Sequence, residues 1–105
     1  MKIEIPTPVF LTEISNESVK AFEQDVMQGP LFRSIIQRIE DTALAGFERY
    51  SRKIDSSDQV RSFKVIQKNL VSAGYYCEIE VQTKRGLLIG EYKEQYFVID
   101  WSKKH

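Results

Sequence analysis

Apolar residues recur every three or four positions in three stretches of this chain, the spacing of amphipathic helices. The first stretch predicts a helix over residues 16–28 that ends at Gly29, because glycine suits a left-handed cap. The second begins at Pro30, a residue favoured in a first helical turn, and ends near Gly46. We expect one buried face on each helix: Val19, Phe22 and Val26 on the first, and Phe32, Ile35, Ile36, Ile39 and Ala43 on the second.

A third helix is predicted to run from Ser56, which forms a capping box with Gln59, to a stop at Gly74. The segment before it, residues 47–54, fits two interpretations. It continues the helical spacing of the second helix, and it also alternates passably as a strand. A helix through Gly46 would carry an interior glycine, which costs about 1 kcal/mol and favours the strand. The buried face of the third helix is expected to be Val60, Phe63, Ile66, Leu70 and Ala73.

The second half of the chain changes to an alternation of period two, which is typical of strands with one buried face. Residues 75–83 form the clearest strand, with Cys77 on its apolar side, and a turn is expected over residues 84–86. A last strand is predicted over residues 96–102. The intervening residues 87–92 are either a short middle strand or a loop with an apolar tip.

Residues 1–14 contain Pro6 and Pro8, each of which lacks an amide donor and is excluded from a central strand. We therefore expect an extended N-terminal arm whose apolar residues pack on this domain or on a neighbour. The whole chain is predicted to be one α+β domain, with three helices packed on a small antiparallel sheet of about three strands. The arm covers residues 1–14 and the α+β core residues 15–102.

Composition excludes several classes of function. The chain has 105 residues, and its 15 basic and 15 acidic side chains balance, so net charge does not indicate nucleic acid or an anionic membrane. Cys77 is the one cysteine, and the one histidine is His105, which excludes a Cys/His zinc site, a disulfide framework and a catalytic triad with an internal histidine. We expect no cofactor, no signal peptide and no membrane-spanning segment.

Three short motifs fall in a recognisable order. Ala43-Leu44-Ala45-Gly46 ends one helix, Leu70-Val71-Ser72-Ala73-Gly74-Tyr75 ends another, and Ile99-Asp100-Trp101-Ser102 closes the last strand. This order resembles a loose pattern in small proteins of tailed bacteriophages, except that residues 84–95 are longer here. The resemblance covers about residues 35–102. It implies an α+β fold, a strand over residues 47–54 and a viral source, and it carries over no catalytic residues.

The strongest candidates for function are apolar residues with no obvious place in a core. Three consecutive apolar residues after the expected turn cannot all face one side of a strand, so they form either a contact surface or a third strand covered by the arm. Two nearby tyrosines are typical interface residues. The candidate protein-contact residues are Phe10, Leu11, Leu87, Leu88, Ile89, Tyr92 and Tyr96.

Five basic residues could form a patch for phosphates, three on the third helix and two in the expected turn. However, any amphipathic helix needs a charged outer face, and no aromatic residue lies among these positions, as binding of single strands would favour. We therefore favour a solvated surface for the nucleic-acid candidates Arg61, Lys64, Lys68, Lys84 and Arg85.

Glu78 and Glu80 share one strand face, and Glu91 and Lys93 form a Glu-x-Lys, which together could hold Mg²⁺ in a nuclease. Cross-strand charge pairing on a wet sheet face explains them more simply. Cys77 and Trp101 are interpreted as core residues rather than as a reactive thiol and a ligand platform.

These observations lead us to expect a non-enzymatic viral protein that acts through protein–protein contacts, most simply as a structural component of the virion. The alternative is an intracellular phage effector that binds and inhibits a host defence or regulatory protein. The expected partners are copies of itself or other viral proteins, with a host protein in the alternative. The expected location is the virion or the host cytoplasm.

Overall fold

The computed structural model describes residues 4–102 and has the predicted α+β architecture. Three antiparallel strands form one sheet in the order β1-β3-β2, so the last strand of the chain is the central one. The elements are α1 (Pro8–Gln28), α2 (Pro30–Leu44), β1 (Arg49–Ile54), a 3₁₀ turn η1 (Ser57–Gln59), α3 (Val60–Ser72), β2 (Tyr76–Gly86) and β3 (Gly90–Asp100).

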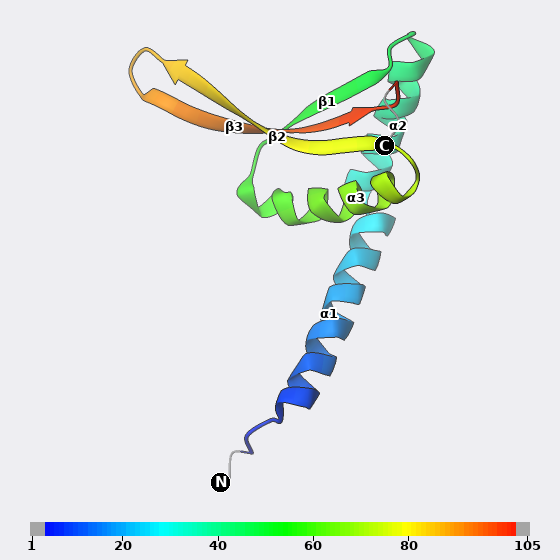
Figure 1. Ribbon diagram of the computed structural model, residues 1–105, viewed down its shortest axis with the longest axis vertical. Helices are drawn as coiled ribbons and strands as arrows, with labels where there is room; N and C mark the ends of the chain where they lie inside the picture. Colours follow the sequence, from blue (N-terminus) through cyan, green and yellow to red (C-terminus); the bar gives the residue numbers. More distant parts are fainter. Residues whose placement is uncertain (1–3, 103–105) are drawn as a thin grey trace.

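Helices α2 and α3 cover one face of the sheet, with α2 against β1 and α3 against β2 (Figure 1). Only the C-terminal part of α1 joins this body, where it packs on α2 and α3. The rings of Phe63 and Phe97 lie 5.0 Å apart at the centre of the core. The predicted buried faces of α2 and α3 are confirmed at their central positions, and the core consists of Val26, Ile35, Ile39, Ile54, Phe63, Ile66, Leu70, Cys77, Phe97 and Ile99.

Residues 49–54 form a strand and not a continuation of the second helix. This is the alternative favoured by the cost of an interior glycine at position 46 and by the resemblance to small phage proteins. Helix α2 ends at Leu44, and Gly46 adopts a φ of +89°, which starts a new direction of the chain. The resulting strand β1 pairs antiparallel with β3, with Tyr50 opposite Ile99. The predicted end of α3 is confirmed in the same way by Gly74, whose φ is +100°.

The prediction of an extended arm over residues 1–14 is wrong for residues 8–14, which are helical, and residues 1–3 lie outside the described residues. Helix α1 begins at Pro8, and the Thr7 side chain accepts a hydrogen bond from the Phe10 N–H at 3.2 Å. Proline fits the first turn of a helix because its missing N–H would have no intrahelical partner there. The prolines therefore mark a helix start.

Two predicted caps are also wrong. Gly29 is extended, with φ −86° and ψ 173°, because the residue before a proline avoids the helical region. A Cβ atom on Gly29 would lie 3.0 Å from the Asp25 carbonyl oxygen, which explains the glycine. Helix α3 begins at Val60 and its N-cap is Gln59 instead of Ser56, because residues 57–59 form a 3₁₀ turn in which the Gln59 N–H donates to the Ser56 carbonyl at 3.0 Å.

The hairpin of β2 and β3 is longer than predicted. Lys84 and Arg85 lie in β2 and not in a turn, and the last strand begins at Gly90 instead of residue 96. Residues 90–95 are almost all polar and show no apolar alternation, so their strand structure depends on pairing with β2. The turn is formed by residues 87–89, and the alternative of a middle strand over residues 87–92 is therefore excluded.

Two parts of the chain project from the body. The radius of gyration is 18.5 Å, whereas a compact domain of this size has about 13 Å. Helix α1 extends away in one direction and the free end of the β2–β3 hairpin in another (Figure 1). Both projections carry residues that the sequence marked as contact candidates.

Candidate protein-contact site

The end of the hairpin is an apolar tip formed by Leu87, Leu88 and Ile89. Their exposed fractions are 106%, 99% and 74%. Leu87 and Leu88 are open to solvent, and Ile89 is partly covered because its side chain lies over Gly86 in the same hairpin. The expected cover by the N-terminal arm is absent, because residues 8–14 belong to α1 and point away from the hairpin (Figure 1). Behind the tip, Arg85 and Glu91 form an ion pair of 3.0 Å across the two strands. This places a small, exposed apolar surface at the end of a paired ribbon.

The two tyrosines predicted to accompany the tip have different environments. Tyr92 is exposed on the ribbon. Tyr96 is half-buried, and its phenol donates a hydrogen bond to the Glu94 carboxylate. This bond lowers the pKa of Glu94 and raises the pKa of Tyr96. Tyr92 therefore belongs with the tip as a contact candidate, whereas the polar end of Tyr96 is already engaged within the sheet.

Helix α1 carries the second exposed apolar surface, which we call the α1 stripe and define as Phe10, Leu11 and Ile14. Every residue from Pro8 to Ala21 is exposed, and Val26 is the one buried residue of the helix. At about 100° per residue, Ile14 and Phe10 lie about a third of a turn or more from the face of Val26 that packs on the body, and Leu11 lies about a sixth of a turn from it. The predicted candidates Phe10 and Leu11 are thus on an uncovered helix surface.

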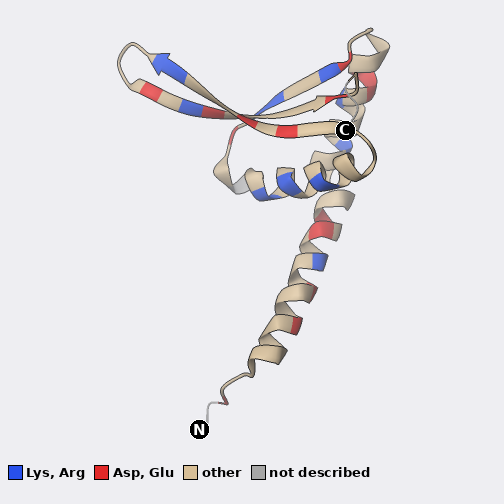
Figure 2. Ribbon diagram, in the orientation of Figure 1, with Lys and Arg blue, Asp and Glu red and all other residues tan. Residues whose placement is uncertain are grey.

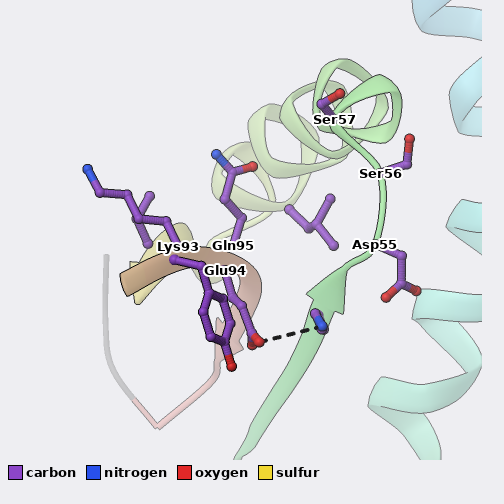
Figure 3. A pocket seen from close by; sticks show the side chains of 10 residues that line it. Asp55, Ser56, Ser57, Lys93, Glu94 and Gln95 are labelled. Atoms are coloured by element: carbon purple, nitrogen blue, oxygen red, sulfur yellow. Dashed lines mark ion pairs between the residues drawn. The ribbon is translucent and has the colours of Figure 1, made fainter. Parts of the chain in front are cut away.

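A hollow of about 620 Å³ lies where β1 ends and the hairpin continues alone. Figure 3 shows Ser56 and Ser57 on one side of it and Lys93, Glu94 and Gln95 on the other. Lys53 closes one side through an ion pair of 3.6 Å with Glu94. The lining mixes both charges and hydroxyls without a buried, unpartnered polar group, so it does not define a ligand class.

The five basic nucleic-acid candidates do not form one patch. Three lie along α3, which carries no acidic residue, and two lie on the hairpin ribbon (Figure 2). The Arg61 guanidinium stacks over the Phe22 ring at 4.0 Å, and Lys68 forms an ion pair of 3.5 Å with Glu23. These contacts attach α1 to α3, and Lys64 lies between them, where it lines a shallow groove between the two helices.

On the ribbon, Arg85 is paired with Glu91, and the Lys84 ammonium lies 6.0 Å from the centre of the Tyr96 ring. The basic side chains therefore serve mainly internal contacts, which supports the interpretation as a solvated surface.

The four residues of the nuclease hypothesis are not brought together. Glu78 and Glu80 lie on the sheet face opposite the helices, in register with Val98 and Tyr96. Glu91 and Lys93 occupy the alternate positions of β3 and point to the other side of the hairpin. Among the side chains that the structure describes, no group of three or more His, Cys, Asp or Glu could hold a metal ion.

Cys77 and Trp101 occupy the positions predicted for core residues. Cys77 is 3% exposed, and burial raises the pKa of its thiol to about 12, which keeps it protonated and unreactive near neutral pH. Trp101 is half-buried and packs against the core cluster.

Sequence reasoning missed one surface, the open edge of β2. The strand β2 spans Tyr76–Gly86 and is paired on one side alone, because the sheet order is β1-β3-β2. No local pattern could have revealed this, because the order of strands in a sheet depends on contacts between distant segments.

Comparison with known proteins adds no relative: no family model, no curated protein and no solved structure matches this chain. Within the described residues, none of the helices has the length and apolar character needed to cross a bilayer. The candidate site therefore rests on the geometry of the two projections.

Proposed function

We propose that this chain is a non-enzymatic viral protein that acts through protein–protein contacts, as a structural component of a bacteriophage particle. The contacts are made by the hairpin tip, residues 87–89, and by the α1 stripe.

The observation that carries the proposal is the exposure of large apolar side chains on both projections. A monomeric protein normally places such side chains against its own core, and a cluster of them on the surface marks a binding site. The helical residues 8–21 add a second argument: an isolated helix of this length is marginal in water, since most helical stability in proteins comes from tertiary packing. A partner on the α1 stripe would supply that packing.

The bacteriophage setting rests on the resemblance of residues 35–102 to small phage proteins. Two features of the molecule are compatible with it. The chain is small, and its exposed apolar surfaces point in different directions, which would let one subunit contact two neighbours. A structural role requires surfaces that bind neighbouring subunits and does not require a catalytic site.

The test is quantitative mass spectrometry of purified phage particles, combined with the charge substitutions Leu88→Glu and Phe10→Glu. We expect the wild-type chain at a fixed ratio to the major particle proteins and a strong loss of each variant. The matched control is Leu44→Glu, which changes another highly exposed leucine (87%, against 99% for Leu88) at the end of α2.

Incorporation of both variants at the wild-type level would contradict the assignment of the contact surfaces. Absence of the wild-type chain from particles, with abundant protein in infected cells, would contradict the structural role and favour the effector alternative. Circular dichroism of each variant shows whether it is folded.

A further inference from the structure

The open edge of β2 extends over most of an 11-residue strand. Natural proteins protect such edges with proline, bulges or short strands, because unpaired main-chain groups recruit another strand. Beyond the end of β1, the hairpin is a two-stranded ribbon, and ribbons of two strands are marginally stable in water. The edge contains no proline, and the pairing of β2 with β3 runs without a bulge from Tyr76 to Gly86.

The structure determines which residues of β2 direct their main-chain groups to this edge. The Trp101 N–H donates to the Glu48 carbonyl at 3.0 Å, which continues the pairing of β1 with β3. Successive residues of a strand bond alternately to its two sides, so the odd-numbered residues of β3 bond to β1 and the even-numbered ones to β2. Their partners on β2 are also even-numbered. The odd-numbered residues of β2 therefore offer their N–H and C=O groups to the open edge.

One of these groups is already used. The Gln67 side chain on α3 donates to the Cys77 carbonyl oxygen at 3.0 Å, which agrees with an outward direction for that group. The run available to a partner strand therefore begins at Ile79 and ends at Arg85, before the apolar tip.

We propose that two copies of the protein pair through this edge, antiparallel about a two-fold axis at Gln82, to form a continuous six-stranded sheet. In this register Ile79 lies opposite Arg85 of the second copy, and Val81 lies opposite Thr83 of the second copy. Each pair exchanges two hydrogen bonds, which gives about eight main-chain hydrogen bonds for the interface. The register uses the whole available run.

Charge complementarity supports a second copy as the occupant. The pairing places Glu80 opposite Lys84 of the second copy, and the two-fold axis repeats this contact. Both residues lie at non-hydrogen-bonded positions, where facing side chains are closest, about 4.5 Å between Cα atoms. The exposed Val81 (56%) gains a β-branched neighbour in Thr83 of the second copy.

Other registers are less favourable. A two-fold axis at Glu80 would place the two Glu80 carboxylates of the dimer opposite each other. An axis at Ile79 would place Glu78 opposite Glu80 of the second copy, so both registers oppose like charges. An axis at Val81 would oppose Glu78 and Lys84 but would need the Cys77 carbonyl that Gln67 occupies. The axis at Gln82 avoids all three conflicts.

The same register provides a neighbour for the hairpin tip. Beyond Arg85 the same register directs the turn of residues 87–89 toward residues 75–77 of the second copy, where β2 begins. Tyr75 is half-buried and packs against the edge of the core, so its ring offers apolar surface at that point.

The first experiment measures the molar mass of the purified full chain by size-exclusion chromatography with light scattering over a range of concentrations. We expect a concentration-dependent dimer. The substitution Lys84→Glu should weaken dimerisation by about tenfold or more, because like charges then face each other twice. Adding Glu80→Gln to Lys84→Glu should recover part of it, because this removes the facing like charges without placing a cation beside Arg49, which lies 3.5 Å from Glu80 in the same chain. A monomer at every concentration, a dimer insensitive to Lys84→Glu, or a double variant without recovery would overturn the proposal.

The second experiment fixes the register with Gln82→Cys, which places two thiols on the two-fold axis. Mild oxidation should convert this variant to a disulfide-linked dimer, whereas Lys93→Cys, on the neighbouring strand of the same ribbon, and the wild-type chain should not cross-link. Equal cross-linking of both cysteine variants would overturn the pairing. The dimer is tested without particles, so its failure is distinguishable from failure of the proposed structural role.

Discussion

Helix α3 and the first part of α1, residues 8–21, both carry large apolar side chains, yet only those of α3 are covered. Phe63, Ile66 and Leu70 of α3 are buried against the sheet, whereas every residue from Pro8 to Ala21 is exposed. An apolar stripe therefore predicts that a helix has a partner, but it does not say whether that partner belongs to the same chain. For α3 the sheet is joined to it by a short connection, whereas no part of the described residues 4–102 covers residues 8–21.

Hydrogen exchange gives the largest expected contrast between the two helices. In the dilute monomer, amides in the middle of α3 should exchange only through global unfolding, at least ~1,000-fold more slowly than in an unfolded chain. Amides of residues 11–20 should exchange nearly as fast as in an isolated peptide, since little tertiary packing stabilises them. The rates are measured by NMR or mass spectrometry. Equal protection of both helices in the monomer would contradict the distinction.

Substitution of one phenylalanine in each helix sharpens the same contrast. Phe63→Ala should lower the free energy of unfolding by about 3–5 kcal/mol, because it removes a fully buried ring from the centre of the core. Phe10→Ala should change it by less than about 0.5 kcal/mol. Urea denaturation of both variants measures the two effects. Similar losses would show that residues 8–21 are packed in the monomer.

The pH dependence of stability tests the burial of Cys77 in the body. Burial raises the pKa of this thiol to about 12 from an ordinary value of 9.0. The unfolded chain therefore releases the thiol proton at a lower pH than the folded chain, and stability is lost as the pH rises from about 9 toward 12. Cys77→Ala should show a shallower decline than the wild type in the same range. Parallel curves would mean that the folded thiol is accessible to water.

The contacts that attach α1 to α3 are expected to contribute least. Lys68→Met removes an ion pair with Glu23 that lies at the surface, and it should cost between about 0 and 1 kcal/mol. The neighbouring variant Lys64→Met serves as the control, and thermal unfolding at low salt is the measurement. A loss of several kcal/mol would show that α1 depends on this ion pair for its position.

The elements that the sequence predicted well are those whose structure is decided locally. The apolar spacing of α2 and α3 identified half of the core cluster. The glycines at positions 46 and 74 identified where the chain changes direction after each of these helices. The start of α1 was missed because Pro8 fits both an extended arm and a first helical turn.

The parts that were missed in the sheet depend on distant segments. Residues 90–95 become a strand because they pair with β2, and the open edge of β2 follows from the central position of β3. Val98 illustrates the same limit: it is fully buried on the face opposite the helices, in register between Ser51 and Glu78 on the two outer strands. The candidate tip, by contrast, was recognisable because three consecutive apolar residues fit neither period.

The angle between α1 and α2 at the Gly29–Pro30 junction determines where the far end of α1 lies. The uncovered part of α1, residues 8–21, is about 21 Å long, so a tilt of ten degrees at its base would move its end by roughly 4 Å. The extended backbone of Gly29 and the fixed φ of Pro30 hold the base in one orientation. A subunit that contacts its neighbour through the α1 stripe would therefore transmit the angle of this junction directly into the spacing of the assembly.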